Sequence, residues 1–195
     1  MTFEIIVIGA SYGGLSALQI LLPELAPDFP LPLVVVQHRR KEADDGLCEY
    51  LRRRSPLPLI EPNDKEKVEP GRVYLAPRDY HLLLEKSIFA LSTESPVGFA
   101  RPSIDVLFES AADIYRERVI GVILTGANRD GARGLAKIKA FGGLTVVQDP
   151  QSAESRSMPE AAIAATTVDR ILPLAEIAPF LNELCHPIQR LLHAR

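Results

Sequence analysis

The sequence predicts an α/β protein with one domain, in which a doubly wound, mostly parallel sheet has helices on both faces. Short apolar runs alternate with longer amphipathic stretches along the 195 residues, and polar or glycine-rich turns follow the apolar runs. No internal repeat or long linker divides the chain. We therefore expect a single domain at 1–195, with its core at about 3–181 and a tail at 186–195.

Near-continuous apolar runs are typical of strands that are covered on both faces. Runs of this kind lie at 3–8, 33–36, 119–124, 144–148 and 171–174. Two shorter strands are expected at 57–60 and 71–76, on either side of a charged turn. The segments 81–84 and 88–92 predict a β-hairpin that closes through Glu85-Lys86-Ser87.

Amphipathic segments, with apolar residues three or four positions apart, predict the helices. They lie at 15–25, 46–54, 103–115, 132–141, 160–165 and 175–184. The first of these helices is expected to end or kink near Leu22, because Pro23 lies inside its pattern. Ser103 is a candidate N-cap for the third helix, and Gly142-Gly143 is a suitable stop after the fourth.

Composition and charge exclude several classes of function. The formal net charge is −3 at pH 7, which argues against non-specific binding of nucleic acid. No apolar run approaches the roughly 20 residues that cross a bilayer, so no membrane insertion is expected. Cys48 and Cys185 have neither metal-site nor disulfide spacing. Met1 is followed by a strand rather than a basic, cleavable leader, so the expected location is cytoplasmic.

The first apolar run ends in a turn of small residues, Gly9-Ala10-Ser11-Tyr12-Gly13-Gly14, with Ser11 at the entrance of the helix that follows. Glycines let the backbone turn sharply, and the N–H groups of a first helical turn point into the same space. Such a turn presents either a nucleophilic serine or a phosphate site. A dinucleotide site needs glycine where Ser11 stands and an acidic residue where Gln37 and His38 end the second strand. Both differences disfavour a nucleotide.

Ser11, His38 and the turn at 125–130 each follow a predicted strand, and the carboxyl ends of parallel strands meet at one edge of the sheet. Ser11, His38 and Asp130, the last residue of this turn, supply the three roles of acyl transfer, namely a nucleophile, a base and a carboxylate that orients the base. Residue types alone leave other roles open. Ser11 could be a turn or cap residue, His38 a hydrogen-bonded structural residue, and Asp130 a cap of the helix that follows it.

Several short segments occur in an order that resembles one known family. They are Gly9-Ala10-Ser11-Tyr12-Gly13-Gly14, Val36-Gln37-His38, Tyr74-Leu75-Ala76-Pro77 with Asp79 and His81, Arg101-Pro102-Ser103-Ile104-Asp105-Val106-Leu107-Phe108, Leu124-Thr125-Gly126 through Asp130-Gly131-Ala132, Gln148-Asp149-Pro150 and Met158-Pro159. Over about 3–181 the chain resembles the catalytic domain of the CheB family, the protein-glutamate methylesterases of bacterial chemotaxis.

The resemblance implies hydrolysis of glutamate methyl esters on receptor helices, and often deamidation of glutamine there, with no cofactor and no metal. Carried over residue by residue, Ser11 is the nucleophile, His38 the general base and acid, and Asp130 the carboxylate that orients His38. We expect backbone N–H groups near Tyr12 and Ala127 to hold the oxyanion, because these residues lie beside the nucleophile and in the aspartate turn.

The partners that the resemblance implies are methylated chemoreceptor or sensor helices, with a methyltransferase or a separate regulatory protein as further candidates. Many family members carry a phosphorylatable receiver domain ahead of the catalytic domain. Because Met1 stands immediately before the first predicted strand, we expect a stand-alone catalytic domain without a receiver.

The chain departs from the family pattern at two places. Tyr12 stands where threonine is usual, and Ala127-Asn128 stands where methionine and glycine are usual. The residue types of the expected triad are retained, which favours an esterase. The alternative is a catalytically impaired CheB-like binding module in a signalling complex.

Other polar residues in these segments have less specific interpretations. His81 either closes its hairpin or joins the site, and Arg101 either meets a carboxylate or has a structural role. Arg39 and Arg129 are expected to be exposed to solvent. His186 and His193 in the tail are also expected to be exposed to solvent.

Overall fold

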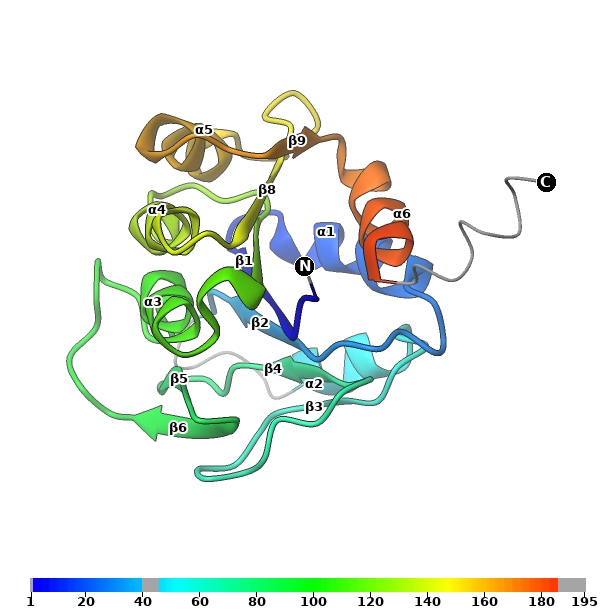
Figure 1. Ribbon diagram of the computed structural model, residues 1–195, viewed down its shortest axis with the longest axis vertical. Coiled ribbons are helices and arrows are strands. Elements are labelled where there is room, and N and C mark those ends of the chain that lie inside the picture. Colours follow the sequence, from blue (N-terminus) through cyan, green and yellow to red (C-terminus); the bar gives the residue numbers. More distant parts are fainter. Residues whose placement is uncertain (1, 40–45, 186–195) are drawn as a thin grey trace.

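The computed structural model describes residues 2–39 and 46–185, and its centre is a seven-stranded sheet (Figure 1). The strand order is β3-β4-β2-β1-β7-β8-β9, and every neighbouring pair is parallel. The strands are β1 Ile5–Ala10, β2 Leu33–Gln37, β3 Leu59–Ile60, β4 Val73–Leu75, β7 Val119–Ile123, β8 Leu144–Gln148 and β9 Arg170–Leu172. The predicted fold class, a doubly wound sheet in one domain, is confirmed.

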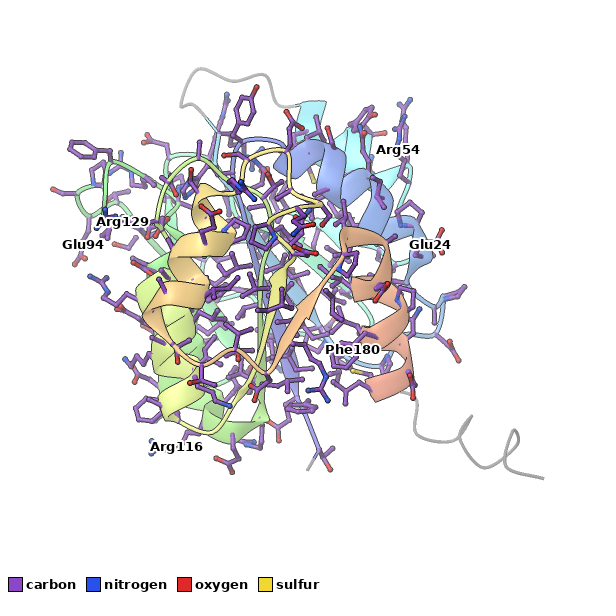
Figure 2. The ribbon with its side chains drawn as sticks, turned by 90° about the horizontal axis from the view of Figure 1, so that it is seen from above. Glu24, Arg54, Glu94, Arg116, Arg129 and Phe180 are labelled. Atoms are coloured by element: carbon purple, nitrogen blue, oxygen red, sulfur yellow. The ribbon has the colours of Figure 1, made fainter. Side chains whose placement is uncertain are left out.

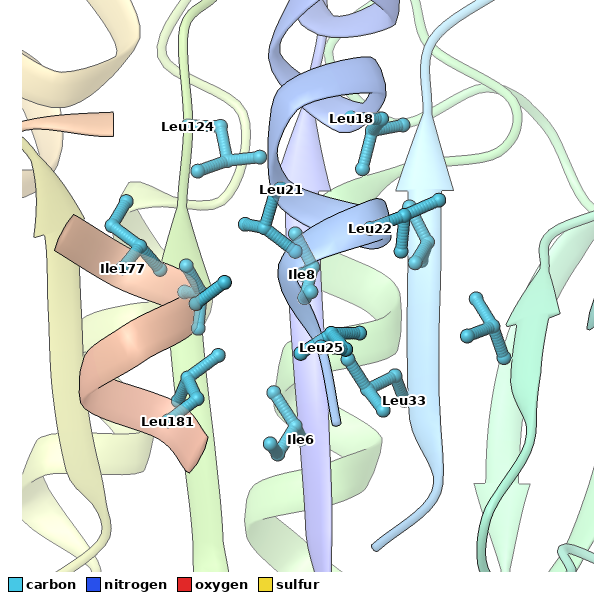
Figure 3. Packing of buried hydrophobic residues seen from close by; sticks show 14 of the residues in the cluster. Ile6, Ile8, Leu18, Leu21, Leu22, Leu25, Leu33, Leu124, Ile177 and Leu181 are labelled. Atoms are coloured by element: carbon cyan, nitrogen blue, oxygen red, sulfur yellow. The ribbon is translucent and has the colours of Figure 1, made fainter. Parts of the chain in front are cut away.

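Helices cover both faces of this sheet, as Figure 1 shows. One face carries α1 Gly14–Leu21, α2 Gly46–Arg52 and α6 Leu174–Cys185, and the other carries α3 Ile104–Tyr115, α4 Ala132–Ala140 and α5 Ser157–Ala165. Strand β1 serves both cores, since Ile6 and Ile8 face the first layer of helices while Ile5 and Val7 face the second. Figure 3 shows the first of these cores, where Ile8 lies beside Leu21 of α1 and Ile6 lies farther along β1, beyond Leu25.

Element boundaries agree with the expected ones in some places and differ from them in others. The first helix ends at Leu21 and continues as a 3₁₀ turn, Leu22–Glu24, which agrees with the stop expected from Pro23. The fifth helix begins at Ser157 rather than at 160, because a proline in the first turn costs no helical hydrogen bond. The helix α6 begins at Leu174, so the strand expected at 171–174 is already complete at Leu172.

The expected hairpin is present as β5 His81–Glu85 and β6 Ile88–Ser92, which pair antiparallel outside the main sheet. Lys86 and Ser87 both have positive φ angles, 44° and 70°, as the tight two-residue turns of hairpins require. The hairpin packs against α3. No helix within 2–39 and 46–185 combines the length and the apolar character that a membrane span requires.

Helices α3 and α4 lie close together because α4 presents Gly134 to its neighbour. A Cβ at this position would stand 2.5 Å from the Cβ of Phe108 and 3.2 Å from the carbonyl oxygen of Asp105. The Asp105 carboxylate also accepts hydrogen bonds from the N–H groups of Gly131 and Gly134, at 2.9 and 2.8 Å. The amino end of α4 is therefore capped by a side chain of α3.

We expect Gly134→Ala to destabilise the protein by about 1–2 kcal/mol. The added methyl group forces the two helices apart, which costs about 1–3 kcal/mol, and the better helix propensity of alanine offsets part of this cost. Urea unfolding of the variant and the parent measures the difference. A higher free energy of unfolding in the variant, as propensity alone would give, contradicts the close packing of α3 and α4.

Candidate active site

The candidate active site lies at the carboxyl ends of three adjacent strands, β2, β1 and β7. Ser11 is the first residue after β1, and His38 is the first residue after β2. Asp130 lies between β7 and α4. The register pairs Ala10 with Gln37, so the turn with the serine and the histidine leave the sheet at the same level. The structure thus brings together the three residues that the sequence predicts at this edge.

The three side chains form a continuous chain of hydrogen bonds. The Ser11 Oγ lies 3.1 Å from Nδ1 of His38, and Nε2 of His38 lies 2.7 Å from Oδ2 of Asp130. The side chains of His38 and Asp130 are only 13% and 5% exposed. An ionised carboxylate accepts the proton of Nε2, which leaves the lone pair of Nδ1 directed at the serine hydroxyl. This arrangement can take a proton from Ser11.

Backbone contacts hold Ser11 in place. Its N–H donates to the carbonyl of Thr125 at 3.0 Å, and its carbonyl accepts from Nε2 of Gln37 at 2.9 Å. Gly13, not Ser11, is the N-cap of α1, and its φ of 77° lies in the left-handed region that favours glycine. Gly14 passes so close to Gln37 that a Cβ would lie 1.9 Å from its Oε1. The side chain of Ser11 is therefore left to contact His38 rather than to cap the helix.

Both oxygens of Asp130 are fully used. Oδ2 accepts from Nε2 of His38 and from the N–H of Ile104 at 2.7 Å, while Oδ1 accepts from Oγ of Ser103 at 2.9 Å and from the N–H of Asp105 at 3.0 Å. Burial opposes ionisation of this carboxyl, but hydrogen bonds from His38 and the two backbone groups outweigh it and hold the pKa of Asp130 below its usual range.

Asp130 does not cap the helix that follows it, which is the capping role that the sequence left open. Asp130 receives the amino end of α3, while Gly131 is the N-cap of α4, the helix that follows it. Ser103 is the N-cap of α3, as expected, and its hydroxyl has a second contact with Asp130. Asp130, just before α4, accepts from the amino end of α3, and Asp105 of α3 accepts from the amino end of α4. The carboxylate beside His38 is therefore fixed by the packing of these two helices.

Tyr12, one of the two residues expected beside the oxyanion, follows Ser11 directly, and the other, Ala127, lies in the loop after β7. Both are exposed, and the Tyr12 side chain is 62% accessible. The carbonyl of Tyr12 accepts from Oγ1 of Thr125 at 2.9 Å, which ties its peptide to the loop that carries Ala127. No hydrogen bond joins the N–H of Tyr12 or of Ala127 to another residue in the described part of the chain. Both donors therefore have no competing acceptor there.

A cleft of about 780 Å³ opens beside His38, lined by His38, Arg39, Asp79, Asn128 and the segment 96–102. Phe99 lies on its rim, fully exposed and with a φ of 66°. Arg129, next to Asn128, projects into solvent on the side of the molecule that also carries Glu94 (Figure 2). The cleft gives an extended ligand access to the histidine.

The less specific residues have mostly structural positions. His81 is buried, accepts from the N–H of Ser103 at 3.2 Å and contacts the Ser95 carbonyl at 3.2 Å, so it holds two segments together. Arg101 binds Asp79, with Nε 3.0 Å from Oδ1, and also donates to carbonyls of the loop at 93–94. Arg129 is exposed, as expected.

Arg39 does not lie in solvent, and that expectation is wrong. Its side chain is only 6% exposed, pairs with Glu61, and donates to the carbonyl of Ala76 at 2.7 Å. The carboxylate of Glu61 lies on a distant segment, so the sequence near Arg39 holds no signal of it. Asn128, which contacts Nδ1 of His38 at 3.2 Å, is the functional neighbour that residue patterns missed; its position as a departure from the family pattern was the available signal.

No group of three or more His, Cys, Asp or Glu side chains within 2–39 and 46–185 is arranged to hold a metal ion. Cys48 and Cys185 are free thiols. Burial raises the pKa of Cys48, and it raises that of Cys185 to about 11. Neither thiol is therefore activated for nucleophilic attack.

Comparisons with known proteins point to the same chemistry. The family model described as CheB methylesterase matches residues 6–181. A protein of Leptospira interrogans named "Putative protein-glutamate methylesterase/protein-glutamine glutaminase" is 50% identical over 94% of this chain and 96% of that protein. A Thermotoga maritima protein named "Protein-glutamate methylesterase/protein-glutamine glutaminase" is 38% identical over 93% of this chain, which spans 54% of its length. The crystal structure of the Thermotoga maritima CheB methylesterase catalytic domain superimposes with a TM-score of 0.90 at 37% identity, covering 94% of this chain and all of that one.

Proposed function

The chain belongs to the CheB methylesterase family, and from this premise we propose that it hydrolyses glutamate methyl esters on chemoreceptor or sensor helices. In this proposal Ser11 is the nucleophile, His38 the general base and acid, and Asp130 the carboxylate that orients His38. The observation that carries it is the hydrogen-bond chain from Ser11 through His38 to the buried Asp130, beside an open cleft.

The reaction follows from this chain of contacts. Nδ1 of His38 accepts the hydroxyl proton as Oγ of Ser11 attacks the ester carbonyl, and Asp130 stabilises the imidazolium. The N–H groups of Tyr12 and Ala127 are proposed to hold the oxyanion. Nδ1 then gives its proton to the departing methoxy group, so methanol leaves and a glutamyl ester of Ser11 remains. Water, activated by the same histidine, hydrolyses that ester to the free glutamate.

Deamidation of glutamine uses the same steps with a different leaving group. His38 would protonate the departing nitrogen, ammonia would leave, and the same acyl-enzyme would give glutamate. Several relatives are named for both activities, which supports a proposal that this chain shares them. As further partners we propose a methyltransferase or a separate regulatory protein that acts on the same receptor helices.

The test is methanol release from methylated receptor fragments by the intact chain, followed by treatment with a serine-directed phosphonate. We expect turnover that the phosphonate stops, with one adduct on the peptide that contains Ser11. The matched control is Ser16→Ala, because Ser16 is an exposed serine on α1, in the same stretch of chain. Tight binding of the fragments without turnover or adduct would favour the binding module instead.

Phe99 is expected to contribute to substrate binding rather than to the chemical step. Gly98 and Phe99 form the turn between Val97 and Ala100, and a positive φ is unusual for an aromatic residue, which points to a functional reason. We expect Phe99→Ala to raise KM about three- to tenfold and to leave kcat within twofold, since burying part of one aromatic ring is worth about 1 kcal/mol.

Steady-state methanol release with receptor fragments of varied concentration measures both constants. The matched control is Ile171→Ala, which truncates an exposed apolar side chain on β9 outside the cleft lining. A fall in kcat at unchanged KM would contradict a binding role for Phe99.

A further inference from the structure

Asn128 makes two side-chain hydrogen bonds that fix the direction of its amide. Its Oδ1 accepts from the backbone N–H of Asp130 at 3.1 Å, and its Nδ2 lies 3.2 Å from Nδ1 of His38. Because a backbone N–H is only a donor, the atom facing it must be the amide oxygen. The amide nitrogen, which is only a donor, therefore faces the histidine.

The contact at His38 is with the nitrogen that faces the serine. Nδ1 carries a single lone pair, and both Oγ of Ser11, at 3.1 Å, and Nδ2 of Asn128, at 3.2 Å, lie within its reach. A donor at this position is compatible with a neutral imidazole whose proton is on Nε2, next to Asp130. An imidazolium loses this hydrogen bond, because its Nδ1–H would face the Asn128 N–H and only Oγ of Ser11 could accept from it.

We propose that Asn128 is a positioning residue, which keeps His38 as a neutral base with Nδ1 unprotonated. Its hydrogen bond to Nδ1 breaks when His38 takes the proton of Ser11. This inference rests on the proposed function of the site. The amide selects the tautomer that Ser11 needs and opposes protonation of His38 from solvent. A residue without a polar side chain at this position could do neither.

The other charges around His38 act in different directions. The carboxylate of Asp130 on Nε2 stabilises the imidazolium. Arg39, Asp79 and Arg101 line the same cleft, but Arg39 pairs with Glu61 and Arg101 with Asp79, which offsets their charges. The hydroxyl group of Ser11 carries no charge. Glu154 lies against Gly13 in the serine turn, and Arg129 follows Asn128 in exposed chain. Among these described neighbours, Asn128 is the one side chain besides Ser11 that places a donor within hydrogen-bond distance of Nδ1 of His38.

Asn128→Asp separates the histidine contact from the loop contact. One carboxylate oxygen still accepts from the N–H of Asp130, while the other replaces the donor facing Nδ1 with an acceptor. We expect the acid limb of the kcat/KM profile, which falls where His38 becomes protonated, to move to higher pH by about one unit. Asn128→Ala, which removes both contacts, is expected to move the limb in the same direction by less.

A second measurement does not depend on turnover. In protein labelled with ¹⁵N in its imidazole rings, the signals of His38 are expected to show an unprotonated Nδ1 in the parent, and their titration midpoint is expected to rise in Asn128→Asp. The control is Arg129→Gln, which makes the same change in charge at the next, exposed residue. Equal shifts in both variants, or an unmoved His38 titration in Asn128→Asp, would overturn the inference. If the parent chain releases no methanol at all, the proposed function fails, and the NMR titration alone then tests the role of Asn128.

Discussion

Ser11→Ala is expected to lower kcat/KM for methanol release by about 10⁵-fold while leaving the fold intact. Without Oγ there is no acyl-enzyme. Removal of the nucleophile from comparable triads lowers kcat about 10⁶-fold, and the remaining catalysis comes from binding and the oxyanion site. The side chain contributes one contact, to His38, and its backbone contacts to Thr125 and Gln37 do not involve Oγ. The free energy of unfolding should therefore change by less than about 1 kcal/mol.

Methanol release with enzyme in excess over methylated fragment is the sensitive measurement, and prior treatment with the serine-directed phosphonate removes the activity of any trace of parent enzyme. Ser16→Ala again serves as the control and should retain full activity. Activity of Ser11→Ala within tenfold of the parent would show that another group attacks the ester, and the assignment of Ser11 would fail.

The sequence predicted the edge of the sheet at which these residues meet. The strands β1, β2, β7 and β8 are continuous apolar runs with polar residues at their ends, so local pattern was enough to place them. Because parallel strands share a carboxyl edge, Ser11 and His38 could be expected together even though 26 residues separate them in the chain.

What the sequence did not predict depends on contacts between elements. Asp130 caps α3 rather than α4, because the packing of these helices places the amino end of α3 behind the carboxylate. The ion pair of Arg39 with Glu61 likewise joins two segments that are far apart in the sequence, and no local sequence pattern predicts that they meet. Periodicity describes which face of an element is buried, whereas hydrogen-bond partners are set by the neighbour that covers it.

Asp130→Asn is the second variant with a large expected effect, and it combines a loss of activity with a loss of stability. Asp130 accepts two hydrogen bonds on each oxygen, and asparagine has a single oxygen. If the amide nitrogen faces His38, it donates to Nε2, so that Nδ1 carries the proton and cannot accept one from Ser11. We expect kcat to fall by about 10⁴-fold through this exchange of tautomers.

Either orientation of the new amide leaves one N–H of α3, that of Ile104 or that of Asp105, facing an NH₂ group. A buried donor without its acceptor costs about 1–3 kcal/mol, so the free energy of unfolding should fall by that amount at neutral pH. Because the folded pKa of Asp130 is lowered, its contribution is complete above the unfolded value of about 3.9 and is lost as the pH falls through the folded pKa. The difference between parent and variant should therefore narrow in acid.

Asp105→Asn provides the matched control, since it makes the same chemical change in the reciprocal cap. A single oxygen of Asp105 accepts both N–H groups of α4, so asparagine can keep both hydrogen bonds. Burial raises the pKa of Asp105, which means that loss of its charge does not weaken the fold at neutral pH. Urea unfolding and methanol release should thus be affected far less than in Asp130→Asn. Equal losses in the two variants would mean that Asp130 acts only as a helix cap, because the catalytic role requires the contact with His38 that Asp105 lacks.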